Sequence, residues 1–246
     1  MSAKLISIKV KKTLSGILPD QLRWLLINYK RSIRVAGKQK IFGIGNNKTG
    51  TTSLKAAMRE LGYVIGHQRS AENLIYDWSK RDFKRIVQYC KTAQFFQDVP
   101  FSKPYTFIVL DHEFPGSKFI LTVRDNPEQW YTSLTKFHAK KWGKDGRIPA
   151  KEDLQQATYI EKGRPWRTNR FTYSTPEDDP YSKEILIKHY IDYNNSVKEY
   201  FRHRSDDLLI LNVAEDGAYL KLCEFLGEEP VREGFPWKNK TKEVSE

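Results

Sequence analysis

The chain has 246 residues, of which 39% are hydrophobic and 13% aromatic, a composition that allows a folded core and excludes an intrinsically disordered protein. This length suits one sizeable α/β domain and is short for two domains of ordinary size. The net charge is +12, yet residues 1–40 hold ten Lys or Arg and one acidic residue, which leaves +3 for the remainder. We therefore expect a basic arm, residues 1–39, on a nearly neutral domain, residues 40–246. Such an uneven distribution argues against nucleic acid as a partner.

Cysteine spacing and hydropathy argue against several further classes of protein. Cys90 and Cys223 are far apart and form no CxxC pair, so the sequence predicts neither a disulfide framework nor a zinc site. It contains no run of about eighteen apolar residues and no continuous apolar signal core near its N-terminus. From these features we expect a cytoplasmic protein.

The basic arm contains a predicted amphipathic helix that begins near Leu18. Apolar residues from Leu22 to Ile33 recur at helical spacing, with basic residues toward the end, where they suit the helix dipole. Two interpretations remain open. The helix either docks on the domain or lies on an anionic membrane surface as a peripheral contact.

Residues 40–246 alternate between short apolar strands and helices. The expected strands are Ile41–Ile44, Tyr63–Ile65, Ala93–Gln97, Phe119–Val123 and Leu208–Val213. Helices are expected between Gly50 and Gly62, after the Asn126-Pro127 pair, from Ser182 to Arg202, and before Gly227. This alternation predicts an α/β fold in which helices flank a central parallel sheet. The polar segment 140–181 shows no clear periodicity, and we expect it to be an irregular insertion or lid.

The loop between the first strand and its helix, Gly45 to Ser53, has the features of a phosphate-binding loop. Glycines at a strand-to-helix junction bring backbone N–H groups and the positive helix terminus to one point. An ATP-binding loop would place Lys directly after its second glycine, but Thr51 stands there and Lys48 lies inside the loop. The strand FILTV is followed by Arg124, where a metal-binding Asp would be needed. Both departures disfavour a nucleotide kinase or NTPase with an atypical phosphate loop, which is kept as an alternative.

Two segments resemble one known family. GIGNNKTGTTSL is similar to the 5′-phosphosulfate loop of the PAPS-dependent sulfotransferases, and FILTVRDNPEQWYTSL is similar to their 3′-phosphate segment. A weaker likeness to the bacterial and glycan-directed branches extends over about residues 40–240. The resemblance implies a P-loop-like sulfotransferase fold, monomeric or homodimeric, with PAPS as donor and no metal. It also implies transfer to a hydroxyl or amine of a small-molecule, lipid or carbohydrate acceptor, a glycan among them.

The resemblance also implies a set of donor-binding residues. They are Asn47, Lys48, Thr49, Gly50, Thr51, Thr52, Ser53, Arg124 and Ser133. Lys48 would stabilise the charge that grows on the bridging oxygen as the sulfuryl group leaves. Arg124 and Ser133 would hold the 3′-phosphate. Because Asn126 lengthens the spacing between them by one residue, Thr132 is a rival to Ser133.

Catalysis also needs a general base for the acceptor hydroxyl, and the family places one just after a sheet strand. Asp98 follows the strand AQFFQ and is the expected base, although it could instead cap the following turn. His67 and His112 are further candidates.

Other basic residues leave more than one interpretation. Arg164, Trp166, Arg167 and Arg170 could recognise an anionic or sugar acceptor, or form a solvated basic loop. Lys238 and Lys240 would close over the 3′ side of the donor. The last alternative is a basic membrane- or nucleic-acid-binding protein with a vestigial nucleotide site.

Overall fold

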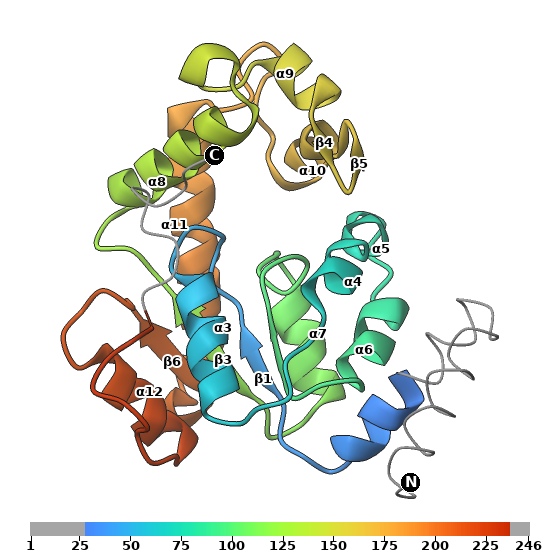
Figure 1. Ribbon diagram of the computed structural model, residues 1–246. Helices are drawn as coiled ribbons and strands as arrows, with labels where there is room; N and C mark the ends of the chain where they lie inside the picture. Colours follow the sequence, from blue (N-terminus) through green and yellow to red (C-terminus); the bar gives the residue numbers. More distant parts are fainter. Residues whose placement is uncertain (1–27, 237–246) are drawn as a thin grey trace, which may run out of the picture.

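The computed structural model describes residues 28–236 as an α/β domain built on a four-stranded parallel sheet (Figure 1). The strands run in the order β2-β1-β3-β6, and every neighbouring pair is parallel. Their bounds are β1 Ile41–Gly43, β2 Phe95–Gln97, β3 Lys118–Thr122 and β6 Leu208–Leu211. The predicted class, a central parallel sheet flanked by helices, is confirmed.

Helices connect the strands along the chain. The first group consists of α3 Thr51–Glu60, α4 Gln68–Glu72, α5 Ile75–Ser79, α6 Lys84–Cys90 and α7 Thr106–Glu113. The second group consists of α8 Pro127–Trp142, η1 Lys144–Gly146, α9 Lys151–Gln156, α10 Arg164–Thr172, α11 Lys183–Tyr200, η2 Ser205–Asp207 and α12 Ala218–Leu226. Residues 28–34 are also helical. A small antiparallel hairpin, β4 Thr158–Tyr159 and β5 Glu161–Lys162, lies between α9 and α10.

Both faces of the sheet are buried, as a parallel sheet requires. Along β3, Phe119 and Leu121 belong to one hydrophobic cluster and Ile120 to another, because successive side chains of a strand point to opposite faces. Side chains of α5, α6, α7 and α11 complete the first cluster. Side chains of α3 and α12 complete the second. The site therefore rests on a sheet that is packed from both sides.

The carboxyl ends of the strands are where ligands bind in open α/β sheets, at the point where the chain changes direction. From β1 the chain crosses to β2 on one side, whereas β3 and then β6 lie on the other. The loops after β1, β2 and β3 thus meet at one edge. Above this edge, α8, α9 and α11 share a third cluster that includes Trp130, Leu154 and Leu186. Figure 1 shows α8, α9, α10 and the hairpin arching over the sheet.

Two local predictions differ from the structure. The strand expected at Tyr63–Ile65 is wrong, because the segment forms only a single parallel bridge, Ile65 to Phe95. Segment 140–181 is more regular than expected, since it holds α9, the hairpin and α10. Short elements of this kind carry little periodicity and depend on contacts made elsewhere in the chain.

Several predictions on the chain ends lie outside the described residues. Most of the basic arm, as well as Lys238 and Lys240, falls in this part, so the two interpretations of the arm stay predictions. Cys90 and Cys223 are both buried and free. Within residues 28–236, no helix combines the length and the apolar character needed to cross a membrane.

Candidate active site

The loop after β1 has the conformation of an anion-binding loop. Lys48 and Gly50 both adopt positive φ, at 70° and 99°, and Gly50 is the N-cap of α3. The first N–H groups of a helix have no partner within the helix, so those of Thr51, Thr52 and Ser53 are available at this end. The first turn of α3 contains no acidic residue. Its positive end therefore faces the cavity without a competing carboxylate.

Thr49 has a different place from its neighbours in the loop. Its side chain is fully buried, and its hydroxyl donates to the carbonyl of Asn46 and lies 2.6 Å from the hydroxyl of Thr122. It does not line the cavity, whereas Asn47, Lys48, Gly50 and the residues from Thr51 to Ser53 do. Thr49 thus holds the shape of the loop from beneath, which the sequence did not predict.

Gly45 fixes the loop against β3. A Cβ atom at this position would lie 2.5 Å from the carbonyl oxygen and 2.6 Å from the amide nitrogen of Thr122, and would also overlap its hydroxyl. Backbone atoms of a buried strand cannot move aside as a flexible side chain can. The loop must therefore approach the strand more closely than any other residue type permits.

We expect Gly45→Ala to lower the free energy of unfolding by about 1–3 kcal/mol, because overpacking strains the buried loop. The measurement is thermal unfolding. The matched control is Gly234→Ala, because a Cβ at Gly234 meets no atom within 4 Å. Equal melting temperatures for the two variants would contradict the close packing at Gly45.

Lys48 extends from the loop into the cavity. Its ammonium lies 3.6 Å from the centre of the Phe137 ring. The pKa of Lys48 is lowered to about 8, chiefly by burial and then by the nearby charge of Arg124, while Asp98 acts in the opposite direction. A partly desolvated cation near two others, Arg124 and Lys141, interacts strongly with an incoming anion. Lys48 is therefore placed to bind negative charge.

Arg124, directly beyond β3, is tied to the same loop. Its Nε donates to the carbonyl of Lys48 over 2.7 Å, and its backbone N–H donates to the hydroxyl of Tyr190 over 3.0 Å. Tyr190 stacks on Trp130 of α8, whose Nε1 donates to the carbonyl of Asn47. Burial lowers the pKa of Arg124, although the group stays charged. Hydrogen bonds thus hold Arg124 against the loop that carries Lys48, so the two cations lie on neighbouring loops.

The structure also distinguishes Ser133 from its rival Thr132. Trp130 and Phe137 both face the phosphate loop, through the bond to Asn47 and the contact with Lys48. Ser133 lies three residues after Trp130 and four before Phe137, so it shares their side of α8. Thr132 is exposed. Helix geometry therefore favours Ser133 as the residue on the loop side, although it does not line the cavity itself.

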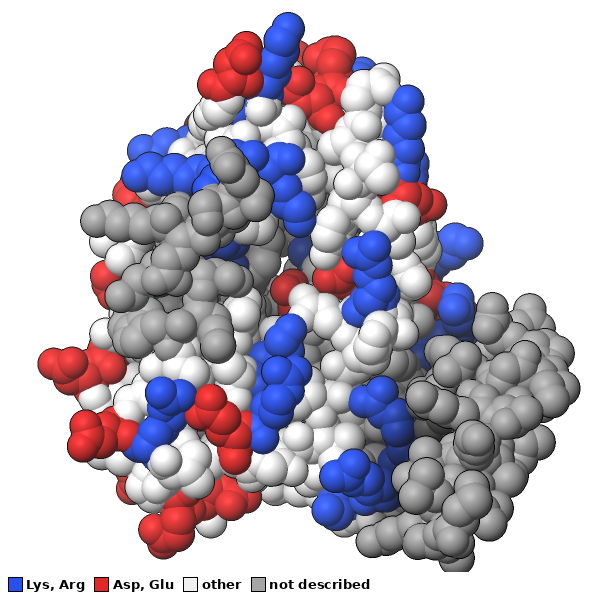
Figure 2. Space-filling model, viewed as in Figure 1, with Lys and Arg blue, Asp and Glu red and all other residues white. Residues whose placement is uncertain are grey.

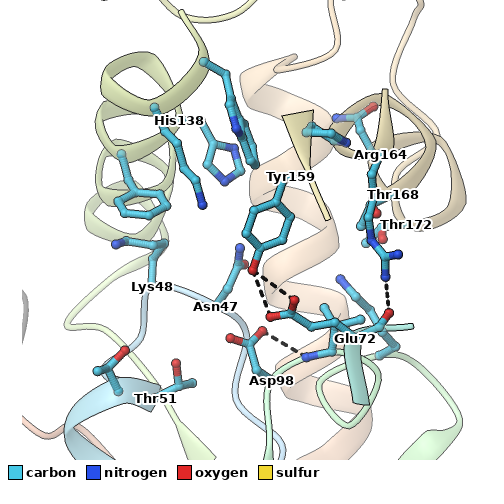
Figure 3. A pocket seen from close by; sticks show the side chains of 18 of the residues that line it. Asn47, Lys48, Thr51, Glu72, Asp98, His138, Tyr159, Arg164, Thr168 and Thr172 are labelled. Atoms are coloured by element: carbon cyan, nitrogen blue, oxygen red, sulfur yellow. Dashed lines mark hydrogen bonds between the residues drawn. The ribbon is translucent and has the colours of Figure 1, made fainter. Parts of the chain in front are cut away.

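Two carboxylates lie on the opposite wall, Asp98 after β2 and Glu72 at the end of α4 (Figure 3). Gln68 donates its amide to both, over 3.0 Å to Asp98 and 3.3 Å to Glu72. The other oxygen of Asp98 accepts the N–H of Val99, and the residue has a positive φ of 63°. Asp98 therefore caps its turn and also faces the cavity.

Glu72 is a site residue that the sequence did not reveal. It is 9% exposed, and both of its oxygens accept the hydroxyl of Tyr159 over 3.0 Å. Burial raises the pKa of Glu72, with Asp98 adding to the effect, while the bond from Tyr159 opposes it. Figure 2 shows basic side chains on several sides of the hollow in this face and acidic side chains within it.

Comparison with known proteins decides the family. A family model described as a sulfotransferase domain matches residues 40–244, well over half of the chain. The chain belongs to the sulfotransferase family. No curated protein matches it. The match extends over β1, the phosphate loop and Arg124. It also covers the segment 140–181 with α9, the hairpin and α10, which we call the lid. All elements of the site therefore belong to the sulfotransferase domain.

Histidines near the sulfotransferase site differ from those expected. His67 is the N-cap of α4 and accepts the N–H of Ser70, and neither it nor His112 lines the cavity. His138 of α8 does line it, with its Nδ1 2.8 Å from the hydroxyl of Tyr181. Burial lowers the pKa of His138 to about 3, with help from the charge of Lys48, so the ring is neutral. Its position four residues after Leu134 and eight after Trp130, both buried, was the signal that helix periodicity offered.

The arginine cluster of the lid is committed to contacts within the sulfotransferase domain. Arg164 is 3% exposed and donates to the carbonyl of Glu72 and to the side chain of Asn73. Arg167 pairs with Glu161, and Arg170 donates to the carbonyl of Thr175. The alternative of a solvated basic loop is wrong for Arg164, which is buried and hydrogen-bonded, whereas recognition of an acceptor by this cluster stays a prediction. Arg164 attaches the lid to α4.

Metal ligands are not grouped in the described part of the chain. Among residues 28–236, no set of three or more His, Cys, Asp or Glu side chains could hold a metal ion. The charges that face the cavity are Lys48, Arg124, Lys103, Lys141 and Arg164 on the basic side, against Asp98 and Glu72.

Proposed function

We propose that this sulfotransferase takes PAPS as donor and transfers its sulfuryl group to a hydroxyl or amine of an acceptor bound beneath the lid. The observation that carries the proposal is the pair of cations Lys48 and Arg124 beside an unobstructed helix N-terminus, with the Nε of Arg124 donating to the backbone carbonyl of Lys48 over 2.7 Å. PAPS carries phosphate at both its 5′ and 3′ positions. Two basic loops at one edge suit such a ligand.

The 5′-phosphosulfate would bind the start of α3, with the N–H groups and hydroxyls of Thr51 and Thr52 and the side chain of Ser53. Arg124 and Ser133 would hold the 3′-phosphate. Asn47 and Gly50 would contribute from the loop that Thr49 supports. Each of these residues except Thr49 and Ser133 lines the cavity, which supports the assignment.

The transfer would be in line. The acceptor oxygen forms a bond to sulfur while the bond between sulfur and the bridging phosphate oxygen breaks, and PAP leaves with the electron pair. Sulfuryl transfer resembles phosphoryl transfer, in which positioning and charge neutralisation do most of the work. The ammonium of Lys48 would neutralise the charge growing on the bridging oxygen. Asp98, on the facing wall, would take the acceptor proton.

A thermal unfolding experiment tests the donor. PAP at about 100 times its dissociation constant should raise the melting temperature by about 5–10 °C without added metal, because a ligand that binds only the native state stabilises it. The rise should be largely lost in Arg124→Ala, since the 3′-phosphate then has no cation.

The matched control is Arg202→Ala, which removes an exposed arginine just beyond α11 that contacts Glu199 and His203. This variant should respond to PAP as the unaltered protein does. No response to PAP, with a clear response to ATP and magnesium, would overturn the proposal in favour of a nucleotide kinase or NTPase.

A further inference from the structure

One lysine of the cavity has no counter-charge in contact with it. Lys103, in the loop between β2 and α7, is 5% exposed and lines the cavity. Its backbone is fixed in a turn, with its N–H bonded to Pro100 and its carbonyl to Thr106. Within residues 28–236, its ammonium makes no hydrogen bond and no ion pair.

A buried, unpaired charge is costly, and proteins retain one where it serves a purpose. Burial lowers the pKa of Lys103 to about 8, and the charge of Asp98 partly offsets this shift. Asp98 itself bonds Gln68 and Val99 instead of Lys103. The ammonium of Lys103 can therefore still donate hydrogen bonds to a ligand, near the carboxylate proposed as base.

Further polar groups in this part of the structure lack partners among residues 28–236. The hydroxyl of Thr172, which also belongs to the cavity wall, is buried without a hydrogen bond to the described residues. The ring of Tyr173 lies 5.8 Å from the ammonium and packs edge-on against His189, whose Nε2 is also buried and unbonded. The pKa of His189 is lowered to about 4, chiefly by burial and then by the charge of Lys103. Hydrogen-bonding capacity is therefore concentrated at this end of the cavity.

We propose that Lys103 and Thr172 form a subsite for a monoanionic group, a carboxylate or a sulfate ester, on the acceptor. The inference rests on the proposed function and deepens it by naming the acceptor class. The ammonium would pair with the anion, and the hydroxyl of Thr172 would donate a second bond to it.

The surrounding charges favour one negative charge over two. Asp98 and Glu72 line the same cavity and would repel a phosphate dianion. The other cations on the acceptor side are held elsewhere. Lys141 lies against the rings of Phe137 and Tyr159, at 5.5 and 4.0 Å, and Arg164 donates to the carbonyl of Glu72. A single unpaired ammonium near the carboxylate of Asp98 suits a monoanion.

Such a subsite would also select the position that is sulfated. An acceptor held by its anion at Lys103 presents to Asp98 only a hydroxyl at a suitable distance from that anion. Two-point attachment of this kind converts binding energy into orientation. The aromatic faces of Trp142 and Tyr173 on the cavity wall fit a flat or ring-shaped acceptor body.

The test compares matched acceptors by calorimetry, with the full chain saturated with PAP and again without PAP. One pair is methyl glucuronide and methyl glucoside, and the other is 4-hydroxyphenylacetate and its amide. We expect the carboxylate member of at least one pair to bind tenfold or more tightly than its neutral partner. This preference should vanish in Lys103→Met, which keeps the length of the side chain and removes its charge.

Lys136→Met, at an exposed position of α8, is the matched control and should retain the preference. An unchanged PAP response in Lys103→Met shows that the variant is folded and separates this inference from the donor assignment. Equal binding within both pairs, no binding of either carboxylate, or a preference that survives in Lys103→Met would each overturn the subsite. Failure of PAP to bind would instead overturn the proposed function, and the titrations without PAP still decide the subsite.

Discussion

Lys48→Met is expected to lower the rate of sulfuryl transfer by about 10²–10³, the size typical of losing one group that stabilises transition-state charge. The loss should fall on kcat more than on the affinity for PAP, because the bridging oxygen gains most of its charge as the bond breaks. The measurement is PAP release from PAPS with the best hydroxyl compound from an acceptor screen. Lys144→Met, an exposed lysine beyond α8, is the control and should transfer normally.

The same lysine should make donor binding depend on pH. Since the pKa of Lys48 is lowered to about 8, its ammonium is present below that pH and is lost as the pH rises above it. The affinity for PAP should therefore fall above pH 8 in the unaltered protein. Lys48→Arg retains its charge over this range, so its affinity should stay nearly level. Parallel curves for the two proteins would rule out Lys48 as the titrating group.

Asp98→Asn is expected to lower transfer by about 10²–10⁴, the usual contribution of a general base, with PAP binding unchanged. Asparagine keeps an oxygen that can accept the N–H of Val99, so the turn after β2 should persist. The substitution thus separates the two interpretations of Asp98, cap and base. Normal transfer in Asp98→Asn would mean that Asp98 only caps the turn after β2 and is not the base.

Glu72→Gln is the matched comparison, because Glu72 shares the amide of Gln68 with Asp98 and faces the same cavity. It should impair transfer less than Asp98→Asn, since Glu72 is held by Tyr159 of the lid. The opposite order would move the role of base to Glu72. Melting temperatures of both variants show whether either loss reflects unfolding.

Features set by local sequence were predicted well. The strand, loop and helix around Gly45 to Glu60 follow from glycine placement and apolar periodicity, and the structure has them. Asn126 does cap α8, accepting the N–H of Gln129. Such features depend on neighbours within a few residues, and a sequence displays those directly.

Features set by distant contacts were not predicted. Glu72 reaches the site only because α4 packs beside β2 and because Tyr159 and Arg164 of the lid bond to it. Lys103 gives no sign in the sequence that it is buried. The failed strand at Tyr63–Ile65 has the same cause, since Tyr63 and Ile65 pack against the second cluster and Val64 against the first without forming a ladder.

The phosphate loop is held in shape by its own carbonyl groups. Those of Asn46, Asn47 and Lys48 accept bonds from Thr49, Trp130 and Arg124 respectively. Of these three successive peptide units, the first is thus fastened within the loop itself, the second to α8 and the third to the segment that follows β3. A nucleotide that binds here finds the loop already ordered, so little conformational entropy is lost on association and more of the contact energy appears as affinity.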